Sequence, residues 1–166
     1  MNKPNTTVRR LTLLSFLLAL ALLLGWLENL IPIPLPVPGL KLGLSNVAIL
    51  FALHMLGRRE AFLLLIAKVI LSSMIFAGFS AFFYALSGGL LSFLIMALLV
   101  TRKSSSILFT SMIGAVFHNI GQVAAAAVLL GTVRLVYLLS ILLFSGLITG
   151  ALTGMAAALV LRKLKE

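Results

Sequence analysis

A lysine, a histidine and two amides stand within long apolar stretches of this sequence, where polar side chains are costly. Lys68 lies in the middle of one stretch, with Ser72 four residues further on. His118 and Gln122 are four residues apart in another stretch, so a helix would place them on one face, with Asn119 beside them. A charge inside a bilayer needs a partner or an aqueous cavity. These residues are therefore candidates for binding a polar ligand, or for a structural network between helices.

Further polar residues stand at the ends of apolar stretches, on what we predict to be the same side of the membrane. They include Glu28, Asn46 and the cations Lys41 and Arg134. With Lys68, the three cations exceed Glu28 by a formal charge of +2, which predicts an anionic ligand with Lys68 as its principal contact. In the rival interpretation Glu28 neutralises Lys68, while the other two cations contact lipid headgroups.

The sequence lacks the side chains of most catalytic and metal sites. It contains no Cys and no Asp, and its three acids, Glu28, Glu60 and Glu166, are predicted at different depths. A carboxylate pair, a Ser–His–Asp triad and a thiolate site are therefore excluded. No glycine-rich phosphate loop opens a helix, and the two histidines are expected at opposite ends of the membrane. We expect no enzyme activity, no metal and no cofactor.

The elements that position these side chains follow from the composition. Of 166 residues, 62% are apolar and 10% are charged, against about 25% charged in ordinary soluble domains. The chain cannot cover a core with a polar shell, which predicts an all-α integral membrane protein. Its 13 basic residues are spread between apolar blocks rather than gathered on one face, so they indicate membrane topology and not a nucleic-acid partner.

Six apolar blocks predict six transmembrane helices in a single domain over residues 1–166. The blocks are 11–31, 42–56, 61–77, 81–100, 107–130 and 135–161. A spanning helix needs roughly 17–25 residues, so the second block is the weakest. The first block is too long for the apolar part of a signal peptide and is predicted to be a retained helix.

The positive-inside rule predicts that both termini are cytoplasmic. In that orientation ten basic residues lie inside, namely Lys3, Arg9, Arg10, Arg58, Arg59, Arg102, Lys103, Arg162, Lys163 and Lys165. Lys41 and Arg134 alone lie outside, and Lys68 is within a helix. An even number of crossings follows, since both ends of the chain are basic.

Two further patterns concern packing and access. Gly146, Gly150 and Gly154 recur at four-residue spacing, which favours close contact with another helix of this protein or with another subunit. Prolines alternate with aliphatic residues over 32–38, which favours extended backbone. This segment is either a rigid connector or a lid over an outward-facing pocket.

Three runs of residues resemble the Gx transporter family, which is also labelled heptaprenyl diphosphate synthase component I. They are PVPGLKLGLSN at 36–46, LSGGLLS at 86–92 and GAVFHNIGQ at 114–122, and the likeness extends over nearly the whole chain. The resemblance implies a substrate-binding S component of an energy-coupling factor transporter. Such six-helix proteins of the bacterial cytoplasmic membrane hold a small substrate in a loop-covered pocket in their outer half.

The resemblance also implies partners. Small residues of the first helix would dock onto a transmembrane coupling subunit driven by two ATPase subunits. Ser15 with Ala19, or Ala21 with Gly25, match that feature.

The synthase label conflicts with the residues, because prenyl synthases hold Mg²⁺ with Asp-rich motifs. If the chain is an S component, we expect its substrate to be anionic and vitamin-like, or related to isoprenoids or quinones. The alternative is a non-catalytic membrane subunit that assists polyprenyl diphosphate or quinone synthesis.

Overall fold

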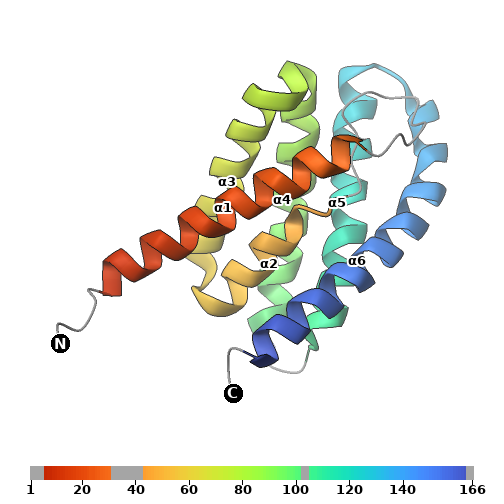
Figure 1. Cartoon of the computed structure of the whole chain (residues 1–166). Coiled ribbons are helices and arrows are strands. Elements are labelled where there is room, and N and C mark those ends of the chain that lie inside the picture. Colours follow the sequence, from red (N-terminus) through yellow and green to blue (C-terminus); the bar gives the residue numbers. More distant parts are fainter. Residues whose placement is uncertain (1–5, 31–42, 102–104, 164–166) are drawn as a thin grey trace, which may run out of the picture.

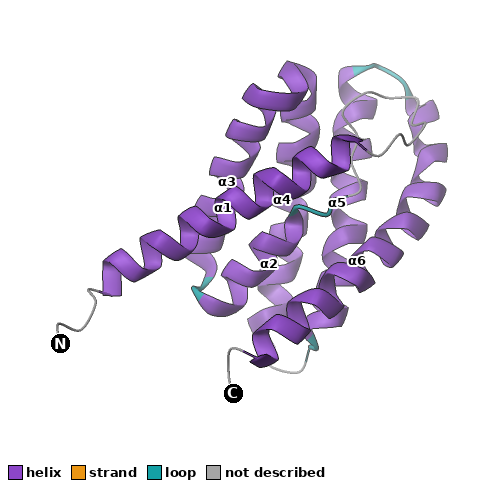
Figure 2. Cartoon of the chain, viewed as in Figure 1, coloured by secondary structure: helices purple, strands orange, loops and turns teal. Residues whose placement is uncertain are grey.

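The fold is all-α. A computed structural model describes residues 6–30, 43–101 and 105–163, and within them contains no strand (Figure 2). The six α-helices are α1 (Thr6–Leu30), α2 (Asn46–Met55), α3 (Arg58–Ser72), α4 (Gly78–Thr101), α5 (Ile107–Leu129) and α6 (Leu138–Lys163). A π-helical turn, η1 (Ser73–Ala77), continues α3, and a 3₁₀ segment, η2 (Val133–Tyr137), precedes α6.

The helices run up and down between two ends of the molecule (Figure 1). In that view α1, α3 and α5 begin near the lower end, and α2, α4 and α6 end there. The helix α1 crosses obliquely in front of the others and packs on α2 and α3. The helices α4, α5 and α6 pack side by side in chain order.

The helices differ from the predicted blocks mainly at their ends. The first begins at Thr6 rather than residue 11, because a polar residue interrupts an apolar block without interrupting helical hydrogen bonding. The third begins at Arg58, directly after Gly57, whose φ of +111° turns the chain out of α2. The second begins only at Asn46, after a turn, and so is shorter than its block.

Four helical stretches are long and apolar enough to cross a bilayer: Thr7–Leu30, Gly78–Thr101, Ile107–Leu129 and Val133–Lys163. At 10 residues, α2 spans about 15 Å, half of a hydrocarbon core of about 30 Å. The 15-residue α3 begins with two arginines and a glutamate and continues into η1. Six complete crossings therefore remain a prediction.

The short helix α2 lies inside the bundle. Residues 48–53 are all buried, so the helix is covered on every side rather than on one stripe. It packs against α1, α3, α4, α5 and α6. Its first residue, Asn46, is therefore placed within the protein.

Glycines bring α4, α5 and α6 into close contact, as their spacing predicts. A Cβ on Gly121 would lie 2.7 Å from Cα of Gly88, and one on Gly150 would lie 2.7 Å from Cα of Met112. Gly146 and Gly154 also face α5. The glycine stripe of α6 thus packs inside this protein, and in lipid such close backbone packing is a main source of helix association.

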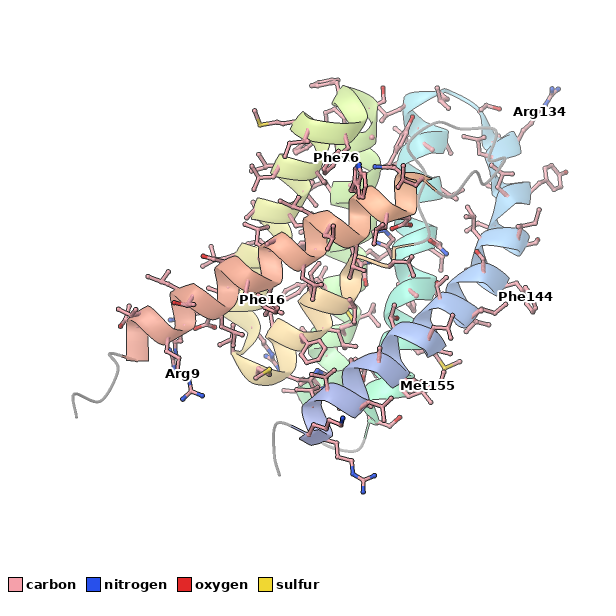
Figure 3. All side chains as sticks on the ribbon, in the orientation of Figure 1. Arg9, Phe16, Phe76, Arg134, Phe144 and Met155 are labelled. Carbon is pink, nitrogen blue, oxygen red and sulfur yellow. The ribbon has the colours of Figure 1, made fainter. Side chains whose placement is uncertain are left out.

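Several of the described basic residues lie towards one end. Arg9 lies near the beginning of α1 (Figure 3), and Arg162 and Lys163 lie in the last turn of α6, which also ends in the lower part of Figure 1. Arg134 projects from the opposite end. This distribution fits the predicted orientation. The predicted positions Lys3, Lys41, Arg102, Lys103 and Lys165, and the proline-rich segment, lie outside the described residues.

Candidate functional site

A small polar cavity lies between α1, α3, α4, α5 and the turn that precedes α2. Its volume is about 30 Å³, enough for one or two water molecules. Its walls combine small apolar residues with polar ones. The lining residues are Ala21, Gly25, Gly43, Ser45, Lys68, Ser72, Ser73, Ala81, Ala85, His118 and Gln122.

Lys68 supplies a positive charge to this cavity. It lies in the middle of α3 with 7% of its surface exposed, on the same face as the buried Ser72. Its Nζ donates a hydrogen bond of 2.9 Å to Oδ1 of Asn46, the first residue of α2. The buried position of α2 therefore gives this lysine a polar contact inside the bundle, as a cation at membrane depth requires.

His118 and Gln122 form the α5 wall and share one face, as predicted. Both are buried, and Nε2 of Gln122 lies 2.7 Å from Nε2 of His118. With Gln122 as donor, His118 accepts at this nitrogen. Gly88 of α4 leaves room for the imidazole, because a Cβ there would lie 3.0 Å from Nδ1 and 2.6 Å from the His118 carbonyl oxygen.

Glu28 holds the chain segment that leads into α2. It is 4% exposed, and its Oε1 accepts a hydrogen bond of 2.6 Å from the backbone N–H of Gly43. Gly43 has a φ of +87°, and a Cβ at this position would lie 2.9 Å from the Asn46 amide and 3.0 Å from the His118 ring. A glycine therefore allows the segment to pass between Glu28 and the cavity.

Two predicted binding residues lie elsewhere. Asn119 turns towards α6, where its Nδ2 donates a hydrogen bond of 2.5 Å to the carbonyl oxygen of Leu142. Arg134 is exposed on η2 and points away from the cavity (Figure 3). The structure thus brings Lys68, His118, Gln122 and Asn46 together with Glu28 close by, but not Arg134.

This arrangement changes the charge balance that the sequence suggested. With Arg134 on the surface and Lys41 outside the described residues, the buried charges near the cavity are one cation, Lys68, and one anion, Glu28. A surplus of +2 is therefore not present among the described residues. Any preference for an anion must come from Lys68, which lines the cavity, whereas Glu28 is not among the lining residues.

The four small residues of α1 fall on two faces. Ala21 and Gly25 are buried and line the cavity. Ser15 and Ala19 are exposed. In this structure Ser15 and Ala19 are therefore the pair that can contact a partner, because Ala21 and Gly25 face the protein's own helices.

Sequence reasoning missed several residues that shape the interior. Ser73 and Gly43 line the cavity, and Asn46 helps to line a second, smaller space of about 10 Å³. Hydroxyl groups of α4, α5 and α6 surround that space, among them Ser92, Ser111 and Thr153. In the sequence these hydroxyl residues recur among glycines, and this pattern could have predicted their position.

Within the described residues no three His, Cys, Asp or Glu side chains lie close enough together to hold a metal.

A comparison with protein families identifies the chain. The family described as heptaprenyl diphosphate synthase component I matches residues 17–160. This chain belongs to that family. The match includes every residue that lines the polar cavity. No curated protein and no solved structure matches the chain. Together with its apolar helices, the assignment makes this family member a multi-pass membrane protein.

Proposed function

We propose that this chain is the substrate-binding S component of an ATP-driven energy-coupling factor transporter in the bacterial cytoplasmic membrane. It would bind a small anionic molecule, vitamin-like or related to isoprenoids and quinones. The chain itself would carry out no catalysis, because it contains no Asp and only three Glu residues. Energy would come from a separate coupling subunit with two ATPase subunits.

The observation that carries the proposal is the buried Lys68 at the wall of a polar cavity. A lysine at this depth is costly, and an apolar side chain of similar size would serve packing better. Its neighbours in the lining, His118 and Gln122 of α5 and Ser45 of the turn before α2, add hydrogen-bonding groups. Convergent polar groups within an otherwise apolar site are typical of ligand recognition.

The cavity is too small for such a substrate in this structure. Ligand sites usually measure about 300–1,000 Å³, so a space of about 30 Å³ must widen before a vitamin-sized molecule fits. The element best suited to move is α1, because most of its surface lies outside the bundle and it packs mainly on α2 and α3. Movement of α1 would carry Ala21 and Gly25 away from Lys68 and open the cavity.

The same helix offers the docking face for the transporter module. Ser15 and Ala19 lie one turn apart on its exposed side, so a helix of the coupling subunit could approach closely there. Substrate capture and partner docking would then use different faces of α1. A tilt of this helix would couple the two events.

A second candidate is a non-catalytic membrane subunit for polyprenyl diphosphate or quinone synthesis. The description of the matched family as a synthase component favours it. In that function the cavity would hold a prenyl diphosphate or a quinone precursor for a soluble synthase. Co-purification from native membranes separates the candidates: recovery of the coupling and ATPase subunits supports transport, and stable recovery of a prenyl synthase without them overturns it.

The test of the binding site begins with native mass spectrometry of the purified protein, which identifies a retained small molecule. Its affinity is then measured in Lys68→Met and Lys68→Arg. We expect a loss of about 100-fold in the first variant and partial retention in the second, because Arg keeps the charge but not the geometry. Unchanged binding in a folded Lys68→Met variant would show that the lysine is structural.

A further inference from the structure

An open groove lies beside the π-helical turn η1, on the outside of the bundle. Its volume is about 440 Å³, within the range of ligand sites. It is lined by Ile70, Ser73, Met74, Gly78, Phe79 and Phe82. Exposed apolar side chains are ordinary where a protein meets lipid, so their presence alone does not indicate a ligand.

Irregular backbone creates this groove. The chain leaves α3 through the wider π turn and enters α4 at Gly78, which has a φ of +73°. Such a turn places Met74 and Phe79 outward, each 80% exposed, with the groove between the two helices. Single π turns within α-helices are frequent at functional sites.

The groove and the polar cavity are neighbours that share one lining residue, the small side chain of Ser73. Ser73 lines both spaces, while its neighbour Ser72 and the cation Lys68 line the cavity alone. On α4 the same division holds, since Ala81 faces the cavity and Phe82 the groove. A buried serine thus separates a charged interior from an apolar exterior.

Within the described part of the chain, a second groove on the molecule lacks such a shared residue. It lies between α4 and α5, measures about 520 Å³ and is lined mainly by apolar residues, including Phe83 and Val128. Among the described residues it shares no lining side chain with the polar cavity. Its one polar residue, Ser87, donates its hydroxyl to the carbonyl oxygen of Gly121.

We propose that the groove at η1 holds the hydrocarbon chain of a single-chain amphipathic anion whose head group reaches Lys68 past Ser73. This inference rests on the proposed function and specifies its substrate class: a phosphate or carboxylate on an apolar chain. The anion meets the lysine inside, and the chain stays among Ile70, Met74 and Phe79 at the lipid boundary. The small cavity then needs room for the head group alone.

The test uses the full chain in phosphatidylcholine nanodiscs, with dodecyl phosphate as probe and butyl phosphate as the same head group on a shorter chain. After correction for partitioning into empty nanodiscs, we expect dodecyl phosphate to bind about tenfold more tightly or better. Met74→Ser and Phe79→Ser should weaken dodecyl phosphate about tenfold and leave butyl phosphate unchanged. Val128→Ser alters an equally exposed residue of the second groove and should change neither. Lys68→Met should abolish binding of both.

The outcomes that overturn the inference are distinct from those that overturn the proposed function. If Met74→Ser and Val128→Ser have equal effects, or if the longer chain is not preferred, the groove does not bind the hydrocarbon chain. In that case binding of butyl phosphate that depends on Lys68 still supports the anion site. Binding that survives Lys68→Met in a folded protein refutes the anion site itself. Displacement of dodecyl phosphate by phosphatidylglycerol added to the nanodisc assigns the groove to a two-chain membrane lipid and refutes a single-chain ligand.

Discussion

The two sides of this bundle pack in opposite ways. Between α4, α5 and α6, glycines let backbones touch, and a Cβ on Gly121 or Gly150 would collide with main-chain atoms. Between α1 and the rest, a Cβ on Gly25 would meet its nearest neighbour, Cβ of Ser45, at 3.9 Å, an ordinary contact. The polar cavity lies along this looser contact. The difference indicates a rigid frame of three helices, which carries His118 and Gln122 on α5, and a helix α1 that is free to shift against the cavity.

The largest expected effect contrasts two glycine substitutions. Gly121→Ala should lower the free energy of unfolding by about 3 kcal/mol, because its new Cβ would lie within 2.9 Å of three backbone atoms. Gly25→Ala should stay within about 0.5 kcal/mol of wild type, since the site has room and Ala favours helix. Denaturant titration in mixed micelles measures both. Equal losses would show that the two sides pack alike.

The two faces of α1 offer the next test. Ala19→Leu, on the exposed face, should prevent assembly with the coupling subunit while substrate binding survives. Gly25→Leu, on the cavity face, should weaken substrate binding about 100-fold, equivalent to about 2.7 kcal/mol, while assembly survives. Pull-down and ligand titration of both variants give the comparison. Loss of assembly in Gly25→Leu alone would place the docking face on the inner side of the helix.

A smaller effect is expected at the segment that leads into the cavity. Gly43→Ala should destabilise the protein by about 1–2 kcal/mol, the cost of a left-handed backbone for a residue with a Cβ. Its Cβ would also press on Asn46 and His118, so ligand affinity should fall as well. Gly131→Ala serves as a control, because it shares a positive φ of +61° but has nothing within 4 Å of a new Cβ. Unchanged ligand affinity in Gly43→Ala would separate this segment from the site.

The smallest effect concerns a single hydroxyl pair in the rigid frame. Oγ of Ser111 and Oγ1 of Thr153 lie 3.0 Å apart and link α5 to α6. Ser111→Ala should cost about 0.6 kcal/mol, the mean for such bonds between membrane helices. A cost of several kcal/mol would mean that hydroxyl bonds rather than glycine contacts hold the frame together.

Much of the architecture follows from the sequence. Apolar blocks separated by short basic or glycine-containing segments determine the helices and their order, because only helices satisfy backbone hydrogen bonds in lipid. The four-residue spacing of His118 and Gln122 determines their shared face, and the glycine spacing in α6 determines a close helix contact. The breaks at Gly57 and Gly78 also follow from the sequence, since the second and third apolar blocks end at residues 56 and 77.

Which polar residues meet was decided by the tertiary structure. Lys68 and Arg134 were both predicted to contribute positive charge to one site, yet one lines a cavity and the other is exposed. Likewise, Ser15 with Ala19 and Ala21 with Gly25 have the same spacing, but the first pair is exposed and the second is buried on a different face of α1. Helical periodicity specifies which residues share a face, but not which neighbour that face meets. In a soluble protein polarity would tell inside from outside, whereas lipid-facing side chains are as apolar as those of the core, so only the packing of the helices distinguishes them.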